Sequence, residues 1–272
     1  MDDNIAIKLE NVSKEYRIYE SNRQKVAHEL LGMNKGMPFK ALSGIDIEIR
    51  KGENVGILGS VGSGRTTLAK IMSGISFPTE GKVGINGKVI PVFDIKSGFD
   101  LNFDGYENIR IKGCMMGWDK KQIKEKQQEI IEFAQLEELI NLKMKAMKPV
   151  DRTMLGLSMV LMDDSEIMVF DSPIKVGSFA QRGRVIEKLK ERAEDGNRTF
   201  VMVNVIWEIT GQLCQRGIVL HNGEVKFDGP FNEAVDLYKE KYRDKGTAMN
   251  KPESNDRESD DEFDGASDMG GI

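Results

Sequence analysis

The stretch Gly59–Thr67 combines residue types and spacing that can bind phosphate. It follows an apolar run, 54–58, that predicts a buried strand, and it precedes a run, 68–72, that predicts a helix closed by Gly74. Its glycines let backbone N–H groups point at phosphate oxygens, and the dipole of the following helix favours an anion. The alternative is a glycine-rich turn without a ligand. The predicted phosphate-binding residues are Gly59, Ser60, Gly62, Ser63, Gly64, Arg65, Thr66 and Thr67.

One position in this loop departs from the usual pattern G-x-x-x-x-G-K-[ST], because Arg65 stands where lysine is expected. Lysine supplies a compact point charge between the outer phosphates, whereas arginine keeps the charge in a larger, planar and forked group. Thr66 offers a hydroxyl to a magnesium ion. We therefore expect phosphate binding to persist while the catalytic geometry changes.

The bulk composition is that of a globular α/β protein. The 272 residues suffice for one large domain or two small ones, and 39% apolar residues support a sizeable core. No run approaches the roughly 18 apolar residues of a membrane span. The acidic start, Met1 to Asn4, has no apolar signal core, so we expect a cytoplasmic protein. Cys114 and Cys214 are too few for a disulfide framework, and both are expected to be buried thiols.

Negative charge is concentrated in the segment 246–272, which holds eight acidic residues against Lys251 and Arg257. The charge of this segment is −6, and the net charge of the whole chain is −5. The rest of the chain therefore carries +1, which gives no support for nucleic-acid binding. Its few apolar residues cannot bury enough surface to fold. We predict an acidic disordered tail, and the alternative is a tail that docks on a basic partner.

Hydrophobic patterning predicts strands separated by helices, and therefore a largely parallel sheet wrapped by helices. The apolar run 167–171 ends in Asp171, and Asn222-Gly223 marks the turn of a hairpin. Asp119 is expected to cap a helix that runs to about Leu139. The other predicted strands are 5–12, 42–49, 199–203 and the two arms of the hairpin at 218–227, and the other predicted helices are 26–31, 185–193 and 232–242.

The stretch from about 108 to 161 reads as an inserted helical subdomain between the phosphate loop and Asp171. Four lysines in its first helix predict a solvated face: Lys120, Lys121, Lys124 and Lys126. Five methionines favour adaptable core or contact surface over a metal site: Met144, Met147, Met154, Met159 and Met162.

Several motifs together resemble the ATP-binding subunit of an ABC transporter, over about residues 5–242. The branch that exports surface polysaccharides, such as teichoic acid or O-antigen, is the most similar. The resemblance implies a P-loop NTPase of the ABC type within 1–245, with an antiparallel β subdomain and the inserted helical subdomain. The motifs are Val12-Ser13-Lys14-x-Tyr16, Gly52-Glu53-x-Val55-Gly56-Ile57, the phosphate loop, Gly105-x-Glu107-Asn108-Ile109, Val176-Gly177 and the Gly223 hairpin.

The resemblance also implies ATP and Mg as cofactors. Tyr16 would stack on the adenine, and Asp171 would hold the magnesium ion together with Thr66. The alternative for Tyr16 is an aromatic residue on a surface loop. Asp171 is the firmer assignment, because an acid that ends a buried strand needs a partner.

The catalytic positions of the family are replaced. Ser172 stands where a glutamate polarises the attacking water, and a positioned base contributes about 10²–10⁴ in rate. Val205 stands where a histidine contacts the terminal phosphate, and His28 and His221 fall in a loop and a hairpin turn that cannot replace it. The signature that clamps the partner's nucleotide aligns with 148–152, which has no serine or glycine. No catalytic residue of the family is intact.

Three hypotheses follow for an ATP-binding subunit of a polysaccharide exporter. The first is a conventional ATPase motor, and the second is a pseudo-ATPase impaired in hydrolysis, which we favour. The third is a scaffold or regulatory subunit that does not drive transport. The expected partners are an integral-membrane permease and a second ATP-binding subunit, in a homodimer or a heterodimer on the inner face of the cell membrane. The tail is too short and too polar for a glycan-binding domain.

Overall fold

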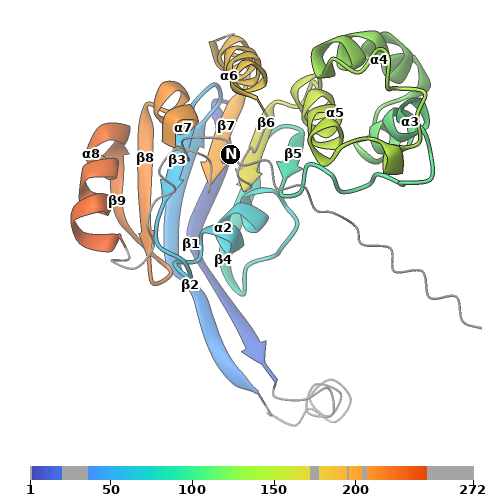
Figure 1. The fold of residues 1–272 in the computed structure, drawn as a ribbon. Helices are drawn as coiled ribbons and strands as arrows, with labels where there is room; N and C mark the ends of the chain where they lie inside the picture. Colours follow the sequence, from blue (N-terminus) through green and yellow to red (C-terminus); the bar gives the residue numbers. More distant parts are fainter. Residues whose placement is uncertain (1, 20–35, 172–177, 195, 204–206, 244–272) are drawn as a thin grey trace, which may run out of the picture.

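The structure is a computed structural model that describes residues 2–19, 36–171, 178–194, 196–203 and 207–243, except the side chains of 207–209. Two β-sheets pack together with helices around them (Figure 1). Four sequence predictions lie outside these residues: the helix 26–31 with His28, the positions Ser172 and Val205, the Val176-Gly177 motif, and the tail 246–272.

A three-stranded antiparallel sheet has the order β2-β1-β4, formed by β1 (Ile5–Ile18), β2 (Met37–Arg50) and β4 (Glu80–Ile85). In β2, alternate residues from Ile45 to Ile49 are buried, as the period-two pattern predicted, whereas β1 buries three consecutive residues at its start, Ile5, Ala6 and Ile7. The first strand is longer than predicted, because its outer half pairs with β2 as far as Ile18 opposite Met37. That half forms a ribbon that projects from the body (Figure 1).

A six-stranded sheet has the order β5-β6-β7-β3-β8-β9. All neighbours are parallel except β9, which pairs antiparallel with β8. Asn222 and Gly223, with φ of 51° and 76°, make the predicted hairpin turn, which requires positive φ at both positions. The strands are β3 (Asn54–Leu58), β5 (Val89–Val92), β6 (Ile167–Asp171), β7 (Thr199–Val203), β8 (Arg216–His221) and β9 (Glu224–Pro230).

The helices are α2 (Arg65–Met72), α3 (Gly105–Met115), α4 (Lys120–Ala134), α5 (Pro149–Leu161), α6 (Phe179–Glu194), α7 (Trp207–Leu213) and α8 (Phe231–Leu237). A 3-10 turn, Met144–Ala146, precedes α5, and a π-helical turn, Tyr238–Tyr242, continues α8. The helices α3, α4 and α5 group at one side of the sheets (Figure 1). Asp119 caps α4 as predicted, but the helix ends at Ala134 because Gln135 adopts a left-handed conformation.

Two predictions about single side chains are wrong. Lys126 does not belong to a solvated face: its side chain is 16% exposed, and its ammonium donates to the carbonyl oxygen of Met162 at 2.7 Å. Cys114 is exposed on α3 rather than buried. Cys214 is buried as predicted, and burial raises the pKa of its thiol to about 12.

The methionine-rich stretch is core, since all five of its predicted methionines are buried. Within the described part of the chain, no group of histidine, cysteine and acidic side chains could hold a metal ion by itself. The same part contains no helix that is both long and apolar enough to cross a bilayer.

Candidate nucleotide-binding site

The predicted phosphate loop joins the carboxyl end of β3 to the first turn of α2. Gly62 and Gly64 have φ of +80° and +100°, values that residues with a side chain rarely adopt. A Cβ on Gly64 would lie 2.4 Å from the carbonyl oxygen of Ala41, and one on Gly59 would lie 2.3 Å from that of Leu220. Close packing therefore requires glycine at Gly59 and Gly64.

Neighbouring strands hold the loop in place. The Gly223 N–H donates to the carbonyl oxygen of Ser63 at 3.0 Å, and the Ser43 N–H donates to the carbonyl of Gly223 at 2.8 Å. The hairpin turn between β8 and β9 thus connects β2 to the loop. The loop has a fixed backbone before any ligand binds, which lowers the entropic cost of binding.

The loop presents groups that suit an anion. The first N–H groups of α2 have no intrahelical acceptor, and the helix dipole favours negative charge there. The Ser63 hydroxyl is buried and has no hydrogen-bond partner among the described residues. Thr66, in the first turn of α2, is exposed. The loop therefore offers phosphate both backbone and side-chain donors.

Arg65 is the first residue of α2 and is partly buried. Burial lowers the pKa of its guanidinium, and the ionised forms of Tyr238 and Asp171 oppose this shift. Asp171 ends β6, and α2 packs against β6 and β7. Because the carboxyl ends of these parallel strands meet at one edge of the sheet, Arg65, Thr66 and Asp171 lie at the same edge.

Tyr16 lies on the projecting part of β1, opposite Phe39 of β2, and is 37% exposed. It is a strand residue, so the alternative of a surface-loop aromatic is wrong. The ammonium of Lys14 lies 5.2 Å from its ring centroid. Two residues beyond Phe39, β2 reaches Ala41, which contacts Gly64. The Tyr16–Phe39 pair therefore stands beside the phosphate loop.

The segment aligned with the family signature, 148–152, forms the start of α5, with Pro149 as the first helical residue. The carboxylate of Asp151 accepts from the Lys148 N–H at 3.1 Å. Arg152 donates to the carbonyl oxygen of Met147 at 2.9 and 3.2 Å. This helix terminus is thus capped by a carboxylate from its own first turn.

The sequence analysis named the segment 148–152 but missed the role of Asp151 as a cap of α5. This role could have been found, because an acidic residue three positions after the start of a predicted helix is a capping signal.

A glycine-rich loop between a parallel strand and a helix, beside an antiparallel sheet and a group of helices, defines an ATP-binding cassette. The chain belongs to the ABC transporter family. The family profile described as ABC transporter matches residues 42–175. The chain is also 30% identical, over 240 residues, to the teichoic acids export ATP-binding protein TagH of Staphylococcus haemolyticus (strain JCSC1435), covering 88% of this chain and 90% of that protein.

Two longer relatives carry the same name. The chain is 31% identical to TagH of Bacillus cereus over 236 residues and 32% identical to TagH of Bacillus anthracis over 237 residues. Each match covers 87% of this chain and 43% of the relative. The chain thus spans less than half the length of these two proteins.

Solved structures share the fold. The dimeric ATP-binding cassette MJ0796, in a post-hydrolysis state bound to ADP and Pi, matches with a TM-score of 0.66 at 22% identity, covering 83% of this chain and 98% of that one. The protein cbiO1 from Clostridium perfringens, part of the ABC transporter complex cbiONQ, matches with a TM-score of 0.63 at 19% identity, covering 87% and 92%. The predicted fold class and family resemblance are confirmed.

Proposed function

We propose that this chain binds Mg·ATP as the ATP-binding subunit of an ABC transporter that exports a cell-surface polymer of the teichoic-acid type. The geometry of the phosphate loop carries this proposal, because Gly59 and Gly64 are packed so closely that only a glycine backbone fits. The names of the relatives at 30–32% identity support the choice of polymer.

The residues of the site fit this ligand. Backbone N–H groups of the loop and the Ser63 hydroxyl would bind phosphate oxygens, and Arg65 would neutralise their charge. Magnesium prefers oxygen ligands and is usually held by one or two protein groups together with the phosphates of the nucleotide. Thr66 and Asp171 would supply those two protein groups. Tyr16, beside the loop, would stack on the adenine.

We further propose that hydrolysis is impaired. Ser172 and Val205 lie outside the described residues, but a serine hydroxyl and an isopropyl group do not accept a proton at neutral pH. At the start of α5, Asp151 caps the helix and adds negative charge where a partner's phosphate would approach. A homodimer would therefore have two weakened sites, and a competent partner would not restore either site fully.

The proposed partners are an integral-membrane permease and a second ATP-binding subunit, which would hold this chain on the inner face of the membrane. The dimeric cassettes with the same fold support a paired arrangement. The helical group α3–α5 is the proposed docking region for the permease. Substrate recognition would belong to the permease.

A second candidate is a scaffold or regulatory subunit that does not drive transport. The capped start of α5 favours it, because this helix terminus is poorly suited to clamp a nucleotide. Under this alternative, complexes with a permease would form without nucleotide.

Calorimetric titration of the protein with Mg·ATP tests the proposal. We expect saturable binding that weakens in Arg65→Ala and Tyr16→Ala, with no continuing heat of reaction. Absence of binding at millimolar Mg·ATP would contradict nucleotide binding and favour the scaffold. Turnover with the permease well above that of an Asp171→Ala control would contradict impaired hydrolysis.

A further inference from the structure

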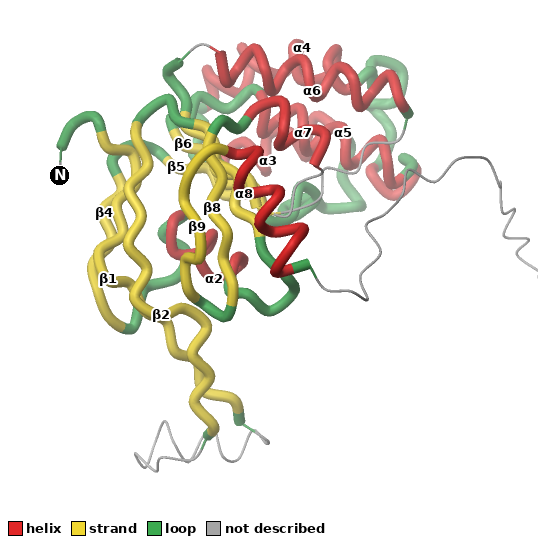
Figure 2. Tube along the Cα trace, turned by 90° about the vertical axis from the view of Figure 1, so that its left-hand side faces the viewer, coloured by secondary structure: helices red, strands yellow, loops and turns green. Residues whose placement is uncertain are grey.

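The outer halves of β1 and β2 form a two-stranded ribbon that projects from the body in both views (Figures 1 and 2). Within this ribbon, Tyr16 lies opposite Phe39, and Ile18 lies opposite Met37. Directly opposite residues of an antiparallel pair point to the same face, and so do residues two apart along a strand. One face of the ribbon is therefore apolar, although its four side chains are between 37% and 71% exposed.

The opposite face of the ribbon is mainly charged. Glu15 lies opposite Lys40, and Arg17 lies opposite Pro38, and all four residues are exposed. Exposed apolar side chains that gather on one face, rather than being scattered, are typical of a binding surface. The apolar face of the ribbon is therefore a candidate for binding a flat, apolar group.

The ring of Tyr16 is held from one side by Lys14. The Lys14 ammonium lies over this ring, 5.2 Å from its centroid, and donates to the carbonyl oxygen of Phe77 at 2.7 Å. Phe77 lies in the segment that connects α2 to β4, and the Thr79 N–H of the same segment donates to the carbonyl oxygen of Ser13 at 2.8 Å. Lys14 thus connects the Tyr16 ring to the segment that follows the helix of the phosphate loop.

The apolar face lies close to the phosphate loop. Phe39 is two residues before Ala41 in β2, a length of about 7 Å in a strand. The carbonyl oxygen of Ala41 would lie 2.4 Å from a Cβ on Gly64 of the loop. A nucleotide with its phosphates in the loop can therefore reach this face with its base. Bases stack on aromatic side chains through their flat faces.

We propose that Tyr16 and Phe39 form one aromatic platform for the base, and that Lys14 is a positioning residue that fixes the Tyr16 ring. The ammonium covers one side of this ring, so the base stacks on the other side. This inference rests on the proposed binding of Mg·ATP and adds two residues to that site. The platform binds the base and the loop binds the phosphates, so the two parts can be tested separately.

Calorimetry with Mg·ATP and with magnesium tripolyphosphate separates the platform from the loop, since tripolyphosphate has no base. Phe39→Ala should weaken Mg·ATP binding about fivefold or more, the loss expected for one stacked aromatic ring. Its affinity for tripolyphosphate should stay within about twofold of the unchanged protein. Phe77→Ala is the matched control, because this phenylalanine is 80% exposed and contributes only its carbonyl oxygen to the contact with Lys14. It should leave both affinities unchanged.

Lys14→Met keeps an unbranched side chain without the charge, and it should weaken Mg·ATP binding about 2- to 5-fold. Lys14→Arg keeps a cation over the ring and should restore most of the affinity. Lys40→Met, on the opposite face of the ribbon, is the control and should bind Mg·ATP like the unchanged protein. Equal losses for Mg·ATP and tripolyphosphate in Lys14→Met, or no recovery in Lys14→Arg, would overturn the positioning role.

The same titrations separate this inference from the proposed function. If all variants bind Mg·ATP alike, the inference fails while nucleotide binding stands. If the unchanged protein binds neither ligand, the proposed function and the base platform fail together.

Proton NMR of the nucleotide-free protein tests the contact between Lys14 and Tyr16 by itself. The ε-methylene protons of Lys14 should resonate upfield of those of Lys40, because the ring current of Tyr16 shields groups over the ring. This shift should vanish in Tyr16→Leu. Equal resonances of the two lysines in the unchanged protein would refute the positioning role.

Discussion

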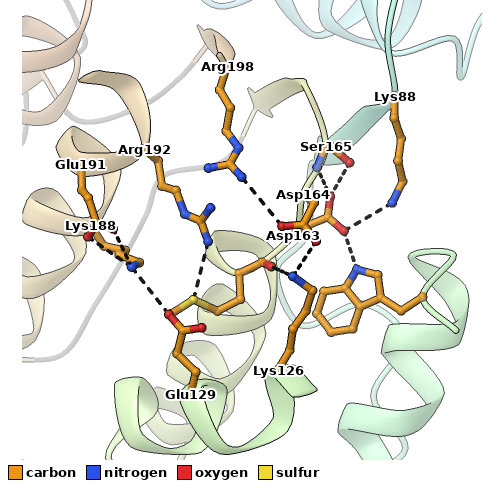
Figure 3. A network of polar contacts seen from close by, with 12 residues as sticks. Lys88, Lys126, Glu129, Asp163, Asp164, Ser165, Lys188, Glu191, Arg192 and Arg198 are labelled. Carbon is orange, nitrogen blue, oxygen red and sulfur yellow. Dashed lines mark hydrogen bonds and ion pairs between the residues drawn. The ribbon is translucent and has the colours of Figure 1, made fainter. Parts of the chain in front are cut away.

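At the amino ends of β5, β6 and β7 the polar side chains are paired, whereas at the carboxyl ends of the same sheet buried polar atoms are left over. Asp163, fully buried before β6, accepts from the Trp118 indole N–H at 2.5 Å and from the Ser165 N–H at 2.8 Å. The Lys88 ammonium lies 3.5 Å from the same carboxylate (Figure 3). This network ties the α3–α4 connection to the sheet.

The neighbouring carboxylate extends the paired region to the helices. Asp164 forms an ion pair with Lys126 of α4 at 2.7 Å, and the guanidinium of Arg198, before β7, lies 3.9 Å away. Lys188 of α6 lies 3.6 Å from Glu129 of α4 (Figure 3). The group α3–α5 is therefore attached at the end of the sheet remote from the loop.

At the carboxyl ends, the Ser63 hydroxyl and His221 Nδ1 are buried without a partner in the described part of the chain. Buried polar atoms are normally paired, so unpaired ones mark a place where a ligand or solvent completes the structure. Two more buried polar atoms without a partner in the described residues lie elsewhere, Asn54 Oδ1 at the start of β3 and Arg192 Nε on α6. The comparison teaches that paired charges at the amino ends attach the helices to the sheet, and that the loop at the carboxyl ends combines an unpaired hydroxyl with a backbone shaped for an anion.

The largest effect is expected from Asp163→Ala, which leaves the indole N–H of Trp118 and the ammonium of Lys88 without their shared partner. The loss also leaves the buried donors of Trp118 and Ser165 without an acceptor, and each such donor costs about 1–3 kcal/mol in the free energy of unfolding. Urea denaturation measures it. Asp164→Ala is the control, since its side chain is 58% exposed and should contribute at most about 1 kcal/mol. Equal effects of the two changes would contradict the buried anchor.

Trp118→Phe sharpens the same comparison, because it keeps an aromatic ring while it removes the donor to Asp163 and part of the buried ring system. We expect a loss of about 1.5–3 kcal/mol, the value for a hydrogen bond to a charged group. Mg·ATP affinity should stay within about twofold of the unchanged protein, because the anchor lies at the opposite end of the strands. A large loss of affinity at unchanged stability would show that the two ends are not separate.

Gly64→Ala changes the phosphate loop, and we expect a smaller loss of stability than for Asp163→Ala. A non-glycine residue at φ +100° with its Cβ 2.4 Å from a backbone oxygen is strained, by about 1–3 kcal/mol. Mg·ATP affinity should fall on the order of tenfold or more, as measured by calorimetry, because the loop must shift. Gly62→Ala is the control: its φ is +80°, but its Cβ would meet open space, so its effect should be smaller.

The smallest effect concerns Lys112, whose buried ammonium donates to the carbonyl oxygens of Ile95 and Ser97. Burial lowers the pKa of Lys112 to about 8, with Asp94 opposing the shift. Between about pH 8 and 10.5 the unfolded chain binds more protons at this site, so the free energy of unfolding contributed by Lys112 rises with pH. We expect a rise on the order of 1–2 kcal/mol.

Comparison with Lys112→Met isolates this contribution, since the other titrating groups are common to both proteins. Denaturation at pH 7.5 and at about pH 10 should show a steeper rise for the unchanged protein. A parallel pH dependence in the two proteins would contradict the lowered pKa.

Local sequence predicted the site where consecutive residues make it. The strand 54–58, the glycines of the loop and the Asn222-Gly223 turn depend on backbone preferences that neighbours in sequence carry. Asp171 was located because an apolar strand that ends in an acid is a local pattern. Helix α4 was predicted too long, because the left-handed conformation of Gln135 has no strong sequence signal.

Predictions that depended on distant partners were less accurate. Lys126 looks solvated within its helix, but its ammonium donates a hydrogen bond to the carbonyl oxygen of Met162 and forms an ion pair with Asp164 from another segment. The sequence predicts a buried Cys114, but this residue is exposed. Polar and apolar residues alternate too weakly along α3 to predict which side of the helix faces solvent. Tyr16 was placed beside the loop only by resemblance, and the pairing of β1 with β2 supplies the physical reason.

By itself, the sequence determined the strand–loop–helix unit, Arg65 at the lysine position of the loop pattern, and Ser172 and Val205 at the positions where the family resemblance predicts glutamate and histidine. These features depend only on which residue stands at each position and on the backbone preferences of its neighbours in sequence. Only the tertiary structure decided that Asp163 anchors the helical group through Trp118, and that the hairpin turn at Gly223 bonds to Ser63 of the loop. The Trp118–Asp163 and Gly223–Ser63 contacts join segments that are distant in the chain, and such contacts form only when the sheet brings those segments together.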